Sequence, residues 1–114
     1  MESSVLIIED ETVVCDLLTR FLETRHYQVV CAQTLTDGLE KAKAFKPSIV
    51  LMDNNLPDGK GVDYISQIKD ILPNIRIIVL SAMDSAHVQA IEKGAERFIR
   101  KPFGFRQIEN AIQA

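Results

Sequence analysis

Short apolar runs alternate with amphipathic segments along the whole of this 114-residue chain, and this alternation limits its possible folds more than any other feature. The apolar runs are typical of strands buried on both faces of a sheet, and apolar residues three and four positions apart are typical of helices that pack along one side. Strands are predicted over residues 5–8, 27–32, 49–52, 75–80 and 97–99. Helices are predicted over residues 14–25, from 35 to the region before Pro47, and over 62–72, 85–93 and 106–112.

Consecutive strand–helix units of this kind predict an α/β fold. Their repetition is typical of a parallel sheet with helices on both faces and right-handed connections. Five units are too few for a closed eight-stranded barrel, so we expect an open, doubly wound, five-stranded sheet. The chain length, with 46% hydrophobic and 25% charged residues, predicts a single domain over residues 1–114. Thr36 is predicted to cap the second helix and Gly94 to end the fourth.

Composition and charge exclude several classes of function. The net charge is -3, whereas surfaces that bind nucleic acid are basic, so no direct contact with nucleic acid is expected. Apolar runs reach four residues and a membrane-spanning helix needs about twenty, so no membrane contact is expected. The first residues lack the pattern of a secretory signal, and Cys15 and Cys31 lack metal-binding spacing. We therefore expect a cytoplasmic protein with two reduced thiols.

Polar residues follow the predicted strands at the point where each strand ends. The first strand leads into Glu9 and Asp10, the third into Asp53, the fourth into Ser81, and the fifth into a segment with Lys101. Ligands of open α/β sheets bind at these carboxyl ends, near the point where the strand order reverses. If the first and third strands are neighbours there, three carboxylates converge and repel one another unless a cation lies among them.

The alternative interpretation is that each polar residue caps the helix that follows it. Asp10 suits this role, but glutamate is not a favoured cap, and Asp53 precedes a long loop. A set of oxygen donors without histidine or cysteine favours Mg²⁺ or Mn²⁺. A lysine and a hydroxyl beside such an ion are the groups that a phosphoryl group requires. The residues therefore predict a metal site that holds a phosphate on or next to Asp53.

The spacing of these residues resembles the receiver domain of bacterial two-component response regulators. The matching elements, in chain order, are Glu9-Asp10, Asp53 with Asn55-Leu56-Pro57 and Gly61, Ser81-Ala82, and Phe98 three residues before Lys101-Pro102. The resemblance extends from Val5 to about Ala111 and implies a flavodoxin-like (βα)5 fold with strand order 2-1-3-4-5. It implies that Asp53 accepts a phosphoryl group from a sensor histidine kinase or a His-containing phosphotransfer domain.

The resemblance also implies roles for the residues around the phosphoacceptor. Mg²⁺ or Mn²⁺ would be bound by Asp10, Asp53 and the backbone carbonyl of Asn55, with Glu9 acting through a water molecule. Lys101 and Ser81 would contact the phosphoryl group.

Two further roles concern the switch and the backbone. Ser81 and Phe98 would form a conformational switch, in which Phe98 turns inward when Ser81 moves. A cis peptide bond before Pro102 would direct Lys101 into the site.

Signalling rather than enzymatic turnover of a substrate is the function implied. Such a domain catalyses only its own phosphorylation and slow dephosphorylation. Its output would pass through the helix over 85–93, the strand over 97–99 and the helix over 106–112 to an effector domain or a second copy of the chain. The sequence leaves open whether the domain acts alone or is the N-terminal part of a longer response regulator.

Rival functions fit the sequence less well. A haloacid-dehalogenase-type phosphatase requires a second aspartate where Asn55 stands, and a dinucleotide-binding module requires a glycine-rich turn where the acidic stretch 9–12 stands. A phosphorylation-independent pseudo-receiver, acting as an interaction module, should have lost Asp10, Asp53 or Lys101, and all three are present. One departure from the family is that the segment between Ser81 and Gly94 is about two residues short.

Overall fold

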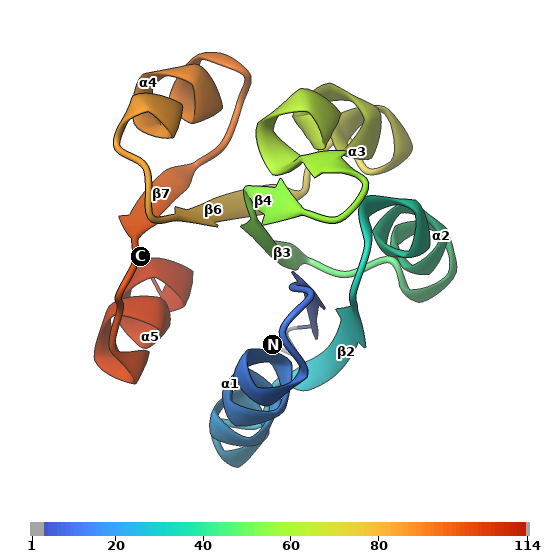
Figure 1. Cartoon of the computed structure of the whole chain (residues 1–114). Coiled ribbons are helices and arrows are strands. Elements are labelled where there is room, and N and C mark those ends of the chain that lie inside the picture. The colour runs from blue at the N-terminus through green and yellow to red at the C-terminus, as the bar shows by residue number, and fades with distance from the viewer. Residues whose placement is uncertain (1–3, 114) are drawn as a thin grey trace.

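Five parallel strands form one central sheet in the computed structural model, which describes residues 4–113 (Figure 1). The order across the sheet is β2-β1-β3-β6-β7. Counted within this sheet alone, that is the order 2-1-3-4-5, so the predicted fold is confirmed. The strands are β1 (Ser4–Ile8), β2 (Gln28–Ala32), β3 (Ile49–Asp53), β6 (Arg76–Ser81) and β7 (Arg97–Arg100).

Helices cover both faces of the sheet, with α1 and α5 on one face and α2, α3 and α4 on the other (Figure 1). Because successive strand residues point to opposite faces, Val5 and Ile7 pack under α1 and α5 while Leu6 and Ile8 pack under the other three helices. The central strands are therefore apolar on both faces, as predicted. The helices are α1 (Thr12–Thr24), α2 (Leu35–Phe45), α3 (Ile65–Ile71), α4 (Ser85–Glu92) and α5 (Phe105–Gln113).

The segment after β3 is more ordered than the turn-rich sequence indicates. A short antiparallel hairpin joins β4 (Asn55–Leu56) to β5 (Gly59–Lys60), and a 3-10 turn, η1 (Gly61–Tyr64), follows it. Helix α3 therefore begins later than predicted. Gly59 adopts a φ of 150°, which side-chain-bearing residues rarely adopt, so the hairpin depends on glycine there.

The cap of α2 also differs from the prediction. Thr34, not Thr36, is the N-cap residue, and its hydroxyl accepts a hydrogen bond from the Asp37 N–H at 3.0 Å. The Thr36 hydroxyl instead donates to Asp58 at 2.9 Å. Asp58 also accepts the backbone N–H groups of Leu35 and Thr36, at 2.8 and 2.9 Å. A carboxylate from the β4–β5 turn thus caps the helix from outside, which a local sequence pattern does not reveal.

We expect the capping of α2 by Asp58 to stabilise the folded protein in a way that depends on pH. The hydrogen bonds from the Leu35 and Thr36 N–H groups lower the pKa of Asp58. The contribution is therefore fully present above the unfolded pKa of about 3.9 and is lost as the pH falls through the lower folded value. We expect Asp58→Ala to lower the free energy of unfolding at pH 7 and to lose that deficit on acidification. Urea unfolding between pH 3 and 7 measures this, with exposed Asp70→Ala as control, and a pH-independent deficit would contradict it.

The two cysteines form a disulfide, so the prediction of two free thiols is wrong for this structure. Cys15 lies on the buried side of α1, and Cys31 lies on β2 beneath that helix. Their Cα atoms are 6.4 Å apart, within the range that a disulfide spans. Their separation of 16 residues in the sequence does not reveal this contact, because the contact depends on how α1 is rotated over the sheet. Among residues 4–113 no other cysteine occurs.

No helix within residues 4–113 combines the length and the apolar character that crossing a lipid bilayer requires.

Candidate functional site

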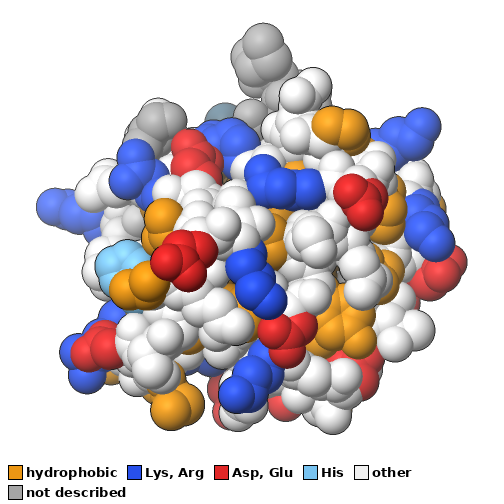
Figure 2. Space-filling model, turned by 90° about the horizontal axis from the view of Figure 1, so that it is seen from above, with side chains coloured by type: hydrophobic (Ala, Val, Ile, Leu, Met, Phe, Trp, Pro, Cys, Tyr) orange, Lys and Arg blue, Asp and Glu red, His pale blue; other side chains and the backbone are white. Residues whose placement is uncertain are grey.

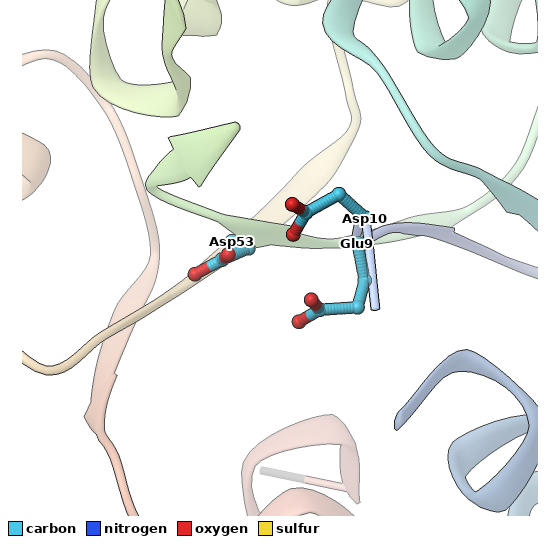
Figure 3. Close-up of side chains that lie close together, drawn as sticks. All are labelled: Glu9, Asp10 and Asp53. Carbon is cyan, nitrogen blue, oxygen red and sulfur yellow. The ribbon is translucent and has the colours of Figure 1, made fainter. Parts of the chain in front are cut away.

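The carboxyl ends of β1 and β3 bring three carboxylates together, as the sequence predicts. These strands are adjacent and paired so that Ile8 lies beside Met52, which places Asp53, the last residue of β3, at the same edge of the sheet as the two residues that follow β1. Glu9, Asp10 and Asp53 each offer a carboxylate oxygen, and these oxygens lie within 4.8 Å of one another (Figure 3). The first two extend from the end of β1 toward Asp53. Glu9 and Asp53 are buried, whereas Asp10 is exposed.

One ammonium group lies against this acidic cluster. Lys101 follows β7, and its Nζ is 3.1 Å from Asp53 Oδ1 and 3.5 Å from Glu9 Oε1. Its backbone N–H donates to the Ser81 carbonyl at 2.9 Å, and the peptide bond to Pro102 is cis. Four strand ends thus supply the groups of one site.

The charges of the site are unbalanced. Burial raises the pKa of Asp53, and the Asp10 charge adds to this against the opposing effect of Lys101. Burial likewise raises the pKa of Glu9, although the Glu11 N–H that donates to it opposes the shift. Burial disfavours the Lys101 ammonium, but Asp53 and Glu9 together raise the pKa of Lys101. Three carboxylates against one ammonium leave negative charge that a divalent cation would neutralise.

The residues present fit a hard cation. A hollow of about 220 Å³ is lined by side chains from both acidic strand ends, the first residue of β4 and the segment after β7. Its donors are carboxylate and backbone oxygens, which suit Mg²⁺ or Mn²⁺. The lining residues are Glu9, Asp10, Glu11, Asp53, Asn55, Ala82 and Lys101.

Three of the sequence-predicted residues, Ser81, Phe98 and Pro102, lie outside this lining. Ser81, buried at the end of β6, accepts a hydrogen bond from the Met83 N–H at 3.1 Å through its Oγ. Phe98 is half-buried on β7, and its ring stacks on that of His87. It lines a separate surface hollow between α4, β7 and α5.

Asn54 supports the loop that follows Asp53, a role that was not predicted from the sequence. Its Oδ1 accepts the Val62 N–H at 3.0 Å, and its own N–H donates to the Leu80 carbonyl at 2.9 Å. Gly61 packs so closely that an added Cβ would lie 2.8 Å from the Asp53 carbonyl oxygen. Asparagine is a common turn former, so its position directly after a strand was the one sequence feature that could have indicated this role.

An apolar groove beside the acidic hollow was also missed. It has a volume of about 460 Å³ and is lined mainly by α1 and by the segment leading into α5. Leu17 and Phe105, which line it, are 51% and 40% exposed, so apolar surface remains open next to Lys101. Figure 2 shows a different face, over α3 and α4, where acidic and basic side chains are interspersed.

Comparison with known proteins gives a uniform result. A family model described as the response regulator receiver domain matches residues 5–113. The KDP operon transcriptional regulatory protein KdpE of Escherichia coli is 35% identical over 97% of this chain and 50% of KdpE. The chemotaxis protein CheY of Thermotoga maritima is 36% identical over 98% of this chain and 96% of CheY. The chain thus spans about half the length of KdpE and almost all of CheY.

Solved structures agree with these sequence matches. A response regulator from Burkholderia pseudomallei, solved with a phosphorylated aspartic acid, a calcium ion and citrate, has a TM-score of 0.92 and 31% identity. It matches 99% of this chain and 68% of its own. The beryllofluoride-activated NtrC4 receiver domain dimer has a TM-score of 0.90 and 32% identity, over 96% of this chain and 93% of its own.

Proposed function

The chain belongs to the response regulator receiver domain family, and from this premise we propose that Asp53 accepts a phosphoryl group in a Mg²⁺-dependent reaction. The observation that carries the proposal is the contact of the buried Asp53 carboxylate with Lys101, within a cluster of three carboxylates. Such domains are signalling phosphoacceptors, so the only reactions proposed for this chain are its own phosphorylation and the slow reversal.

The phosphoryl transfer follows from the chemistry of these groups. An Asp53 carboxylate oxygen attacks the phosphorus of a phosphohistidine, a P–O bond forms, the P–N bond breaks, and the imidazole of the donor leaves. Lys101 pairs with the oxygens of the phosphoryl group, and the Ser81 hydroxyl donates a hydrogen bond to it. Mg²⁺ or Mn²⁺, when bound, would neutralise charge on the same oxygens.

The ligands proposed for the metal differ in their freedom to bind it directly. Asp10 is exposed at the rim of the hollow and is proposed as a direct ligand, with Asp53 and the Asn55 carbonyl. Both oxygens of Glu9 already have partners, since Oε2 accepts the Glu11 N–H and Oε1 lies near Lys101. This supports a contact of Glu9 with the ion through water.

This difference predicts unequal effects of two substitutions on Mg²⁺ binding. Asp10→Ala is expected to weaken binding roughly 100-fold, and Glu9→Ala about tenfold, the usual scale for a residue that acts on a ligand indirectly. Asp10→Ala should also raise the free energy of unfolding of the metal-free protein, because the Asp10 charge opposes ionisation of Asp53. Calorimetric Mg²⁺ titration and urea unfolding measure the two effects. Unchanged Mg²⁺ affinity in Asp10→Ala would refute the assignment.

The partner that donates the phosphoryl group is proposed to be a sensor histidine kinase or a His-containing phosphotransfer domain. It must bring its phosphohistidine to Asp53, so it must contact the surface around the acidic hollow. The apolar groove borders that hollow, shares Glu11 and Lys101 with it, and exposes Leu17 and Phe105. We place the apolar part of the donor's surface there.

The output is proposed to pass through the face formed by α4, β7 and α5. Ser81 and Phe98 would transmit phosphorylation to it, and an effector domain or a second copy would bind it. The chain spans about half of KdpE and almost all of CheY, so it is proposed to act in the cytoplasm either as the receiver domain of a longer regulator or as a stand-alone receiver. The net charge of -3 supports the absence of direct nucleic-acid contact by this domain.

Treatment with acetyl phosphate and Mg²⁺ tests the proposed function. Intact-mass spectrometry should detect the addition of one phosphoryl group, and peptide mapping should place it on Asp53. Chelation of the metal should prevent the reaction. A folded protein that stays unmodified would instead favour the pseudo-receiver alternative, a module that binds partners without phosphorylation.

A further inference from the structure

Helix α4 is held to the rest of the molecule by few buried side chains. Within the described residues of α4, only Ala86 and Ala90 are buried. Its larger apolar side chains face outward, with Val88 66% and Ile91 44% exposed. Hydrophobic side chains lie beside a histidine on the face shown in Figure 2. Because alanine buries little apolar area, contacts made by the first turn of α4 contribute a large share of its attachment.

Two contacts join that first turn to β7. The rings of His87 and Phe98 are stacked, with centroids 4.7 Å apart and an angle of 8° between their planes. Asp84, just before α4, pairs with Arg100 at 3.1 Å. Both partners of this ion pair are about two-thirds exposed, so it contributes little. The aromatic stack, with Phe98 half-buried, is the stronger of the two contacts.

The stack is connected to the acidic site through consecutive contacts. The Lys101 N–H donates to the Ser81 carbonyl, and the Ser81 Oγ accepts the Met83 N–H in the loop that leads into α4. A movement of Ser81 toward the acidic hollow would therefore be transmitted to the loop that precedes His87.

We propose that His87 is a positioning residue that holds Phe98 in the surface hollow between α4, β7 and α5. This inference rests on the proposed function, in which Phe98 turns inward when Asp53 is phosphorylated. Phe98 packs at the edge of the core and lines a hollow together with His87 and Ile91, so a turn of Phe98 away from this hollow would separate the two rings. The stack thus opposes the switch, and by linkage it weakens the binding of any activator that favours the inward state.

Beryllofluoride with Mg²⁺, which mimics the phosphoryl group, is the probe. We expect His87→Ala to bind beryllofluoride about two- to tenfold more tightly than the wild type, the range that loss of one aromatic stack allows. His87→Phe keeps a planar ring in place and should restore wild-type affinity. Val88→Ala, on the same helix, removes an exposed side chain and should leave affinity unchanged. Affinity is measured by NMR titration, together with the ring resonances of Phe98, which should shift in metal-free His87→Ala.

The outcomes separate this inference from the proposed function. Tighter binding by His87→Ala with rescue by His87→Phe supports the role of the stack. Unchanged or weaker binding by His87→Ala, in a protein whose wild type responds to beryllofluoride, overturns the role of His87 and leaves the phosphoacceptor intact. A wild type that does not bind beryllofluoride overturns the proposed function itself.

Discussion

Asp53→Asn is expected to abolish Mg²⁺-dependent phosphorylation by acetyl phosphate and, at the same time, to stabilise the metal-free protein. The loss of phosphorylation should be complete, because the amide of asparagine lacks the negatively charged oxygen that attacks phosphorus. Among the described residues, Glu9 is the one other carboxylate that contacts Lys101. Glu9 is fully buried and already accepts the Glu11 N–H, so it is a poor substitute. Intact-mass spectrometry measures the loss.

The gain in stability follows from the charges that meet at the site. Like charges about 4 Å apart repel by roughly 1–4 kcal/mol, depending on how well solvent screens them. Asp53→Asn removes one of three negative charges while Lys101 keeps Glu9 as a partner. We therefore expect the free energy of unfolding at pH 7 to rise by about 1 kcal/mol or more.

The pH dependence of that gain provides a second measurement. Because burial raises the folded pKa of Asp53, the wild type becomes more stable as the pH falls through that value toward the unfolded pKa of about 3.9. The advantage of Asp53→Asn should therefore be largest near neutral pH and should shrink on acidification. Asp16→Asn makes the same chemical change at an exposed position on α1 and is the control. Persistent phosphorylation of Asp53→Asn, or a loss of stability at pH 7, would contradict the assignment.

The sequence predicted the sheet and most of the acidic site because both depend on a simple geometric rule. Apolar runs such as Val5–Ile8 and Ile49–Met52 occupy the buried strands, and parallel strands end at the same edge. Residues that directly follow two adjacent strands must then lie close together. The position of Lys101 beside Asp53 follows from the same rule, since β7 also ends at that edge.

The features that were missed depend on contacts between distant segments. The Asp58 carboxylate reaches α2 from the β4–β5 turn and accepts a hydrogen bond from the Thr36 hydroxyl, so the predicted cap residue is engaged by a distant segment. The stack of His87 on Phe98 requires α4 to be placed and rotated over β7. Neither arrangement leaves a periodic pattern in the chain, and a lone histidine on a helix gives no sign of its partner.

The disulfide is the clearest case of such a contact, and its reduction should have a large effect on stability. A bond between Cys15 and Cys31 closes a loop of 16 residues, which restricts the unfolded chain. A loop of this length corresponds to about 3 kcal/mol in the chain-entropy model. We therefore expect reduction to lower the free energy of unfolding by about 3 kcal/mol, measured by guanidinium unfolding with and without dithiothreitol.

A double variant, Cys15→Ala with Cys31→Ala, separates the bond from other effects of the reductant, because its stability should not respond to dithiothreitol. Thiol labelling of the denatured wild type should find no free thiol before reduction and both cysteines after it. If both thiols react without reduction, the disulfide is absent from the protein in solution.

In the reducing cytoplasm proposed for this chain, the disulfide would be reduced to two thiols. In the reduced protein, the contact of α1 with β2 would depend on buried side chains such as Leu18 and Leu22. Phosphorylation should therefore be measured in both the reduced and the oxidised protein, and the two rates compared.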